Sequence, residues 1–269
     1  MVKQTALGID CKQFMETAAS FSSNEFLQGE MLRRLTIGTE GNLSLVWAPF
    51  EHICKTARVA VVGICPGRTQ AENALRAFRS AMQRGLGTRE ALRQAKLTGG
   101  FSGPMRANFV DMLDHIGLNT ALQVESCRAL FQTESEFAHF TSAVRYPAFI
   151  DNANYTGKPE MLQTPLLREI IDSAFVEEAL QLRHAIWIPL GPVPAVALKH
   201  LAAKGCLRHD QILEGLPHPS GANAERISYF LGRKKKEALS IKTNAIAIDA
   251  ARESLMRAVE KWHKAERKG

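Results

Sequence analysis

The stretch Val59-Ala60-Val61-Val62-Gly63-Ile64-Cys65-Pro66-Gly67 decides the fold. Its first six residues form a continuous apolar run, mostly β-branched, which is typical of a parallel strand buried on both faces. The Cys-Pro-Gly triplet then ends the strand in a loop. The stretch therefore predicts an α/β domain in which a loop follows directly on a buried strand.

Strand and helix patterns alternate along the rest of the chain. Besides residues 59–64, short runs predict strands at residues 137–144, 185–190 and 211–216. Helical spacing predicts an N-terminal helical layer over residues 12–36 and helices over residues 70–84, 88–96, 105–115, 162–182, 194–203, 223–231 and 245–264. This alternation is typical of a three-layer α/β/α fold with a short four-stranded parallel sheet. We expect one domain over residues 1–269, with a core at about 58–233 and helical additions at both ends.

The composition is that of a globular protein that is attracted to polyanions. A length of 269 residues and a hydrophobic content of 45% suit a packed α/β domain. Lys and Arg number 34 against 27 Asp and Glu, a net charge of +7, which favours nucleic acid as a partner. Basic proteins without a nucleic-acid partner can carry the same charge, so charge alone leaves both interpretations open.

The cysteines predict a reducing, cytoplasmic location. They are five in number, scattered and never arranged as C-x-x-C: Cys11, Cys54, Cys65, Cys127 and Cys206. No basic leader precedes an apolar stretch, and the longest apolar runs are far too short to span a bilayer. The eight histidines are dispersed, so we expect no metal ion. We also expect no other cofactor and no membrane association, and the sequence implies no obligate protein partner.

Two loops that follow predicted strands carry the functional prediction. The first is residues 63–67, and the second, His218-Pro219-Ser220-Gly221, follows about 150 residues later. Carboxyl ends of parallel strands meet at one edge of a sheet, where ligands bind. In this order, each after a strand, the two loops resemble the signature loops of uracil-DNA glycosylases.

Other segments extend the resemblance to about residues 58–233. Residues 100–106, running into 108–118, look like the Phe-bearing loop and helix of bacterial branches of that superfamily. Residues 141–147 and 188–191 resemble its second and third strands. Some branches bind an iron–sulfur cluster, but Tyr146 stands at one cluster position and no N-terminal C-x-x-C exists, so the resemblance implies no cluster here.

The resemblance implies a pocket for a base that has been flipped out of DNA. Phe101 would stack on the flipped pyrimidine, with Ile64 and Ser142 as further base-binding residues. From the sequence alone, Phe101 could equally be a core residue. Ser142 stands where relatives often have an Asn, and a hydroxyl cannot make the two-point contact of an amide, which leaves uracil selectivity open.

Catalysis would depend on His218. In the resemblance, this imidazole stabilises negative charge on the base as the N-glycosidic bond breaks. Cys65 departs from the water-activating Asp or Asn of well-known relatives. It could act as a small residue, with a carboxylate such as Glu72 helping, or as a thiolate nucleophile if a cationic neighbour lowered its pKa.

A further set of residues would contact the DNA backbone. Ala222 stands near a position where some relatives carry a larger apolar wedge. The whole set is Pro66, Gly67, Arg68, Ser220, Gly221, Ala222 and Asn223. The basic run at residues 233–236 is interpreted as a solvated helix end rather than as a dedicated DNA contact.

We therefore hypothesise a DNA glycosylase that excises uracil or a modified pyrimidine and leaves an abasic site, in repair or in defence against phage with modified DNA. A close alternative is excision of a glucosylated hydroxymethylcytosine-type base. Two other classes stay open: a non-catalytic nucleic-acid-binding module, and a thiol enzyme acting on a small molecule through Cys65.

Overall fold

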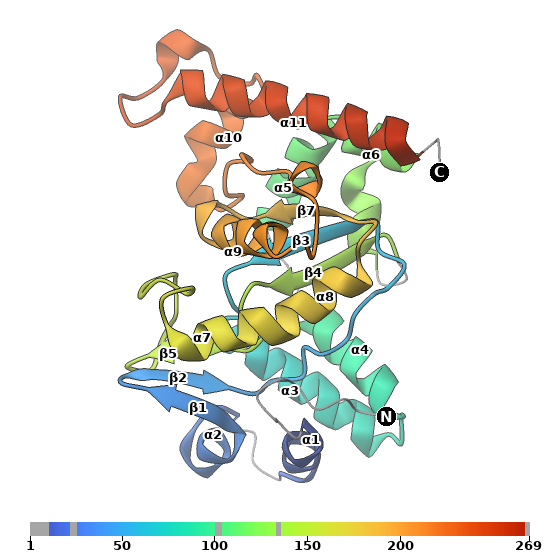
Figure 1. Ribbon diagram of the computed structural model, residues 1–269, viewed down its shortest axis with the longest axis vertical. Helices are drawn as coiled ribbons and strands as arrows, with labels where there is room; N and C mark the ends of the chain where they lie inside the picture. The colour runs from blue at the N-terminus through green and yellow to red at the C-terminus, as the bar shows by residue number, and fades with distance from the viewer. Residues whose placement is uncertain (1–10, 22–25, 100–103, 133–135, 267–269) are drawn as a thin grey trace. The chain divides into compact units, whose positions relative to one another are not determined.

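The computed structural model describes residues 11–21, 26–99, 104–132 and 136–266 (Figure 1). The chain forms two compact units, each assembled from three separate segments. Unit 1 comprises Met1–Ile53, Gly63–Gly100 and Thr141–Gln181, and unit 2 comprises Cys54–Val62, Phe101–Phe140 and Leu182–Gly269. The division falls within the strands β3 (Val59–Gly63) and β4 (Ala138–Ser142).

A parallel sheet forms as predicted, and the fold class is α/β. It has three strands in the order β4-β3-β7, with β7 at Ile186–Pro189. β3 pairs with β7 in parallel, from Val59 opposite Ile186 to Val62 opposite Pro189. The strands that the sequence analysis placed at residues 59–64, 137–144 and 185–190 are thus confirmed.

The fourth predicted strand, at residues 211–216, is wrong. Only an isolated parallel bridge between Ile212 and Trp187 and a hydrogen bond from Leu213 N to Trp187 O (2.8 Å) continue the sheet there. A 3-10 turn at His209–Gln211 precedes the bridge. Gly215, with φ of +120°, turns the chain out of the extended conformation soon after it. Pairing therefore cannot propagate.

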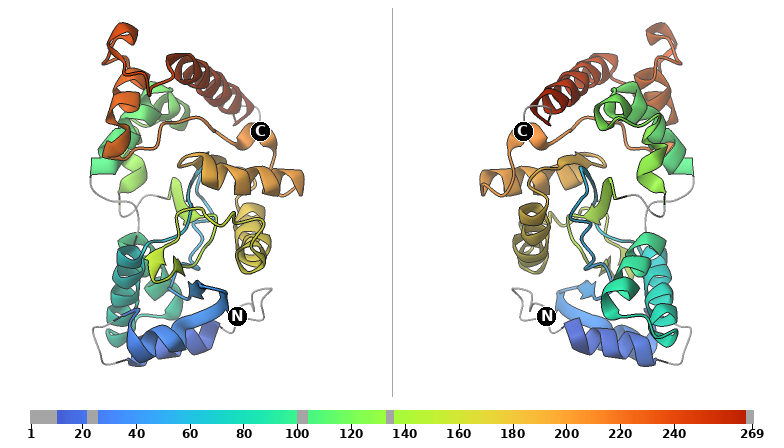
Figure 2. Two further views of the ribbon diagram at one scale, coloured as in Figure 1. Left: turned by 90° about the vertical axis from the view of Figure 1, so that its left-hand side faces the viewer. Right: turned by 90° about the vertical axis from the view of Figure 1, so that its right-hand side faces the viewer.

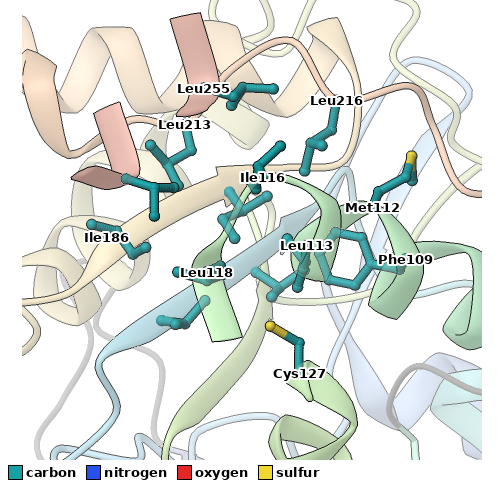
Figure 3. Close-up of a cluster of buried hydrophobic side chains, with 14 of the residues drawn as sticks. Phe109, Met112, Leu113, Ile116, Leu118, Cys127, Ile186, Leu213, Leu216 and Leu255 are labelled. Atoms are coloured by element: carbon teal, nitrogen blue, oxygen red, sulfur yellow. The ribbon is translucent and has the colours of Figure 1, made fainter. Parts of the chain in front are cut away.

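Both faces of the parallel sheet are buried in unit 2. Side chains of α5 (Pro104–His115), α6 (Leu118–Leu122) and α11 (Ala245–Glu266) form one core with Val59, Val61, Ile186 and Ile188 (Figure 3). On the alternate positions, Ala60 and Trp187 are fully buried, and α9 (Pro192–Ala203) packs on β7. Burial on both faces explains why the strand sequence shows no polar alternation.

The other predicted helices are also present. Unit 1 contains α1 (Cys11–Ser20), α2 (Gly29–Leu35), α3 (Arg68–Gln83), α4 (Thr88–Thr98), α7 (Pro165–Ile170) and α8 (Val176–Gln181). A π-helical turn at Ile171–Phe175 joins α7 to α8, so the helix predicted at residues 162–182 runs from Pro165 to Gln181 with one widened turn. α3 and α4 lie side by side (Figure 2). A Cβ at Gly99, which ends α4, would lie 2.9 Å from Gln70 O, and this close approach requires a glycine.

A second sheet in unit 1 was not predicted. It is antiparallel, with the order β1-β2-β5-β6, and consists of β1 (Thr36–Glu40), β2 (Leu43–Val46), β5 (Ala148–Ile150) and β6 (Ala153–Asn154). Its strands have two to five residues, which is too short for an alternation of polar and apolar side chains to identify them in the sequence. The turn residues did carry a signal, because Gly41, Asp151 and Asn152 all adopt positive φ, as tight hairpin turns require. None of the helices in the described ranges has the length and apolarity needed to cross a membrane.

α10 (Ala224–Phe230) follows the second loop and packs against α5 and α11 in unit 2. It confirms the helix predicted at residues 223–231. A 3-10 turn at Gly221–Asn223 links this second loop, which we call the His218 loop (residues 218–221), to α10.

Candidate functional site

His218 lies at the carboxyl end of β7, within unit 2. Gly191 follows that strand, and a Cβ at this position would lie 3.9 Å from Cδ2 of His218. Gly191 has φ of +97°, a conformation that glycine adopts without strain. The imidazole therefore sits beside the end of a parallel strand, where α/β proteins bind their ligands.

The hydrogen bond to His218 fixes its protonation. The backbone N–H of Ser220 donates to Nδ1 at 3.3 Å, so Nδ1 carries no proton. Burial lowers the pKa of the imidazole below its ordinary value of 6.5, and the ring is therefore neutral at pH 7. A neutral ring whose Nδ1 accepts must carry its proton on Nε2. His218 thus presents an Nε2–H donor.

Two asparagines hold the His218 loop. Asn108 of α5 donates through Nδ2 to Pro219 O at 2.9 Å, and Nδ2 of Asn223 bonds Ser220 Oγ at 3.3 Å. The sequence analysis assigned no role to Asn108, although the residue lies in a segment that carried the resemblance. Gly221 and Ala222 are exposed at the tip of the turn, and a Cβ at Gly221 would meet open space. The residues of this loop that were predicted to contact the DNA backbone therefore lie together.

Cys65, in the first loop, is held as a neutral thiol in unit 1. Its Sγ donates to Tyr155 O at 3.4 Å. Although the residue as a whole is half-buried, burial of the thiol raises its pKa to about 12. Among the described residues, a backbone hydrogen bond at Ala148 acts to lower this pKa, and no cationic side chain does. A thiol in this state is a poor nucleophile and a poor general base at neutral pH.

Ile64 and Ser142 lie near one another, because Val144 N donates to Ile64 O at 3.0 Å in the extension of the β3–β4 pairing. A Cβ at Gly63 would lie 3.5 Å from Ser142 Oγ. The third predicted base-binding residue, Phe101, lies outside the described residues. Within unit 1, the structure thus brings Ser142 close to the end of β3, and its role in base binding stays a prediction.

Arg68 has structural partners. Its guanidinium donates to Leu27 O at 2.9 Å and to Asn152 O at 3.1 Å, and it lies 4.5 Å from the centroid of the Phe149 ring. Its backbone N–H donates to Asn154 Oδ1 at 2.9 Å. Arg68 therefore ties the start of α3 to the antiparallel sheet, and these bonds use two of its five guanidinium N–H donors.

The remaining predicted residues of unit 1 lie around the start of α3. Pro66 is buried, and the N–H of Gly67 donates to Gln70 Oε1 at 3.0 Å. Glu72 forms an ion pair with Arg76 one turn further on, at 3.9 Å. In the part of the chain that the structure describes, no group of three or more His, Cys, Asp or Glu side chains is placed to hold a metal ion.

Sequence reasoning missed a buried polar network in unit 1. Trp47 Nε1 and Tyr146 Oη donate to Glu51 Oε1 at 2.6 and 3.0 Å. Oε2 of Glu51 is buried without a hydrogen-bond partner among the described residues. Burial raises the pKa of this carboxyl group. Next to Tyr146, Arg145 forms a fully buried ion pair with Glu178 at 2.8 Å.

Together, the fold and the loops define an α/β protein with a neutral histidine at the end of a parallel strand. No protein-family profile and no solved structure matches the chain. It is 34% identical over 219 residues to the uncharacterized protein YoxB of Bacillus subtilis (strain 168). The aligned region covers 79% of this chain and 84% of YoxB. The chain therefore belongs to the same family as YoxB.

Proposed function

We propose that this protein is a DNA glycosylase of the uracil-DNA glycosylase superfamily that hydrolyses the N-glycosidic bond of a flipped-out uracil or modified pyrimidine. The observation that carries the proposal is the state of His218, a neutral imidazole whose Nδ1 accepts from Ser220 N. The Nε2–H that this leaves is a preorganised donor at the end of β7.

Such a donor suits this chemistry. When the N-glycosidic bond breaks, its electron pair moves onto the base, and negative charge develops on a carbonyl oxygen of the pyrimidine. The Nε2–H of His218 donates to that oxygen and lowers the energy of the leaving group. Water then adds its oxygen to the sugar carbon, and its proton goes to the departing base. The products are an abasic site and a free base.

In this proposal Cys65 does not activate the water. Its pKa of about 12 favours the role of a small neutral residue over that of a thiolate nucleophile. Bond cleavage then depends on charge stabilisation by His218. Glu72 remains the predicted source of a carboxylate, and it would have to leave its ion pair with Arg76 to orient water.

Ser142 favours a modified base over uracil as the substrate. Its hydroxyl stands where relatives often have an amide, and it cannot read a uracil edge at two points. Excision of a bulkier base, such as a glucosylated hydroxymethylcytosine, is therefore the second candidate function. The net charge of +7 supports DNA as the partner in both cases.

Base release from matched oligonucleotides tests the proposal. The oligonucleotides carry uracil, hydroxymethyluracil, hydroxymethylcytosine or glucosylated hydroxymethylcytosine, and alkaline strand cleavage detects the abasic site. We expect release of at least one base. His218→Ala should slow release by about 100-fold or more, the cost of removing one oxyanion donor. Cys65→Ala is the matched loop control and should retain activity.

Each contrary result points elsewhere. If no base is released while DNA is still bound, the protein is a non-catalytic nucleic-acid-binding module. If release survives His218→Ala in a variant whose thermal unfolding matches the wild type, leaving-group stabilisation by His218 is wrong. Loss of activity in Cys65→Ala alone would return the thiol to the mechanism.

A further inference from the structure

The segment that joins α10 to α11, which we name the basic loop (residues 232–244), exposes a large aliphatic side chain. Ile241 has a relative exposure of 103%, and Ile246 in the first turn of α11 has 74%. The loop leaves α10 and returns to the start of α11 (Figure 1). Single exposed apolar side chains are common on protein surfaces, so the exposure of Ile241 gains meaning only from the anchoring and the charges of the loop that carries it.

The basic loop has a defined conformation. Glu225, in the first turn of α10, accepts hydrogen bonds from Lys234 Nζ (2.7 Å) and Ser240 N (3.1 Å), and also from the hydroxyls of Ser240 and Thr243. These bonds hold the pKa of Glu225 well below its ordinary value. Since Ser240 and Thr243 flank it, Ile241 is held outward at the tip of an anchored turn.

The loop is tied to the turn that carries the His218 motif. Nη2 of Arg226 donates to Lys242 O at 3.4 Å, and Nη1 bonds Asn223 Oδ1 at 3.2 Å. Asn223 in turn bonds Ser220 Oγ at 3.3 Å. All these residues belong to unit 2. The Ile241 tip therefore has a fixed relation to the start of α10.

The cations of the basic loop fall into a paired and an unpaired group. Arg233 and Lys234 are paired, with Asp111 at 2.6 Å and Glu225 at 2.7 Å. Across the residues that the structure describes, Lys235, Lys236 and Lys242 form no ion pair. The interpretation of residues 233–236 as a solvated helix end stays a prediction, since most of the run is exposed. Its first two residues are paired within the protein, and the lysines that follow are available to a polyanion.

We infer that the basic loop contacts duplex DNA, with Lys235, Lys236 and Lys242 on phosphates and Ile241 inserted into the minor groove. An apolar side chain flanked by cations is the combination that minor-groove proteins use. The anchoring by Glu225 means that little conformational entropy is lost on insertion. A lipid surface fits less well, since the basic loop presents no amphipathic helix of its own. The inference rests on the proposed function for the identity of the partner.

The test is equilibrium binding of the full-length protein to labelled duplex and single-stranded DNA. Ile241→Ala should weaken duplex binding about tenfold, which corresponds to about 1.4 kcal/mol, and should leave single-strand binding unchanged. A 2-aminopurine in the duplex should lose its binding-dependent fluorescence change in this variant. Met256→Ala, which truncates another exposed apolar side chain of α11 (46% exposed), is the matched control and should bind both forms normally.

The lysines have a separate readout. Replacing Lys235, Lys236 and Lys242 by Ala should reduce the slope of log K against log salt by up to about 2.7, because each phosphate contact contributes about 0.9.

Contrary results are distinct. Equal duplex affinity of Ile241→Ala and the wild type overturns the inference. Loss of binding to phosphatidylserine vesicles instead of duplex would assign the loop to a membrane, and a loss of self-association would assign it to a second copy of the chain.

The measurements do not use base release. A protein that releases no base but needs Ile241 for duplex binding fails only the proposed function, and one that releases a base with Ile241-independent affinity fails only this inference.

Discussion

Glu51 lies among Cys11, Arg145 and Tyr146, and burial raises the pKa of its carboxyl group. A raised pKa means that the folded protein binds the proton more tightly than the unfolded chain. The resulting stability is complete below the unfolded pKa and is lost as the pH rises through the folded pKa. Arg145 opposes the shift, but desolvation is the larger effect.

We expect Glu51→Gln to flatten the pH dependence of stability. The glutamine keeps an acceptor for Trp47 and Tyr146 and removes the charge that becomes costly at higher pH. The free energy of unfolding, measured by urea denaturation between pH 5 and pH 8, should fall less than in the wild type. Glu253→Gln, a control at a carboxylate on α11 that is 67% exposed, should leave the slope unchanged. Parallel curves for the wild type and Glu51→Gln would contradict this account.

The sequence identified loop residues better than it identified their partners. His218, Ser220 and Asn223 lie close together, because residues two or three positions apart in one turn are neighbours whatever the rest of the chain does. Asn108 and Glu51 gain their roles from segments that are remote in sequence, which no spacing rule reveals. The partners of Arg68 are likewise on distant strands.

At the scale of elements, the strength of the local pattern decided what could be predicted. The continuous run that became β3 specifies a buried strand by itself. The strands β1 and β6 have five and two residues, and their pairing depends on hairpin turns and on the neighbouring strand. Residues 211–216 are apolar enough for a strand, but a single glycine changes their course.

That glycine gives a prediction. Gly215 has φ of +120°, and a Cβ there would lie 2.9 Å from the Cβ of Ala251 on α11. Gly232, with φ of +70°, would meet open space. We expect Gly232→Ala to lower the free energy of unfolding by roughly 1–2 kcal/mol through backbone strain alone. Gly215→Ala should cost about 1–3 kcal/mol more, because α11 must also move.

Thermal and urea unfolding of the two variants provide the measurement. Because Gly215 stands just before the His218 loop, Gly215→Ala should also disturb the base-release activity, whereas Gly232→Ala should not. Equal destabilisation of the two variants would show that α11 does not press on this turn.

At the scale of the whole molecule, the order of segments along the chain does not reveal the two compact units. The sequence analysis treated residues 1–269 as one domain, and the structure divides them into two compact units of three segments each. No linker or change of composition marks the boundaries, because two of them fall inside β3 and β4. In unit 2, helical spacing predicted α5, α10 and α11, and continuous apolar runs predicted β3 and β7. The expected core at about 58–233 was too narrow, because Leu255, Val259 and Trp262 of α11 belong to the core of unit 2.

The π-helical turn between α7 and α8 accommodates one more residue than a regular α-helical turn. Its extra residue is absorbed without breaking the helix, and every later side chain is turned by about 100° relative to an uninterrupted α-helix. With that offset, Arg145 reaches both Ala174 O in the widened turn and Glu178 beyond it, each at 2.8 Å. A homologue that is one residue shorter here would turn its equivalent of Glu178 away from a buried arginine. A deletion in this helix and replacement of that ion pair should therefore be inherited together.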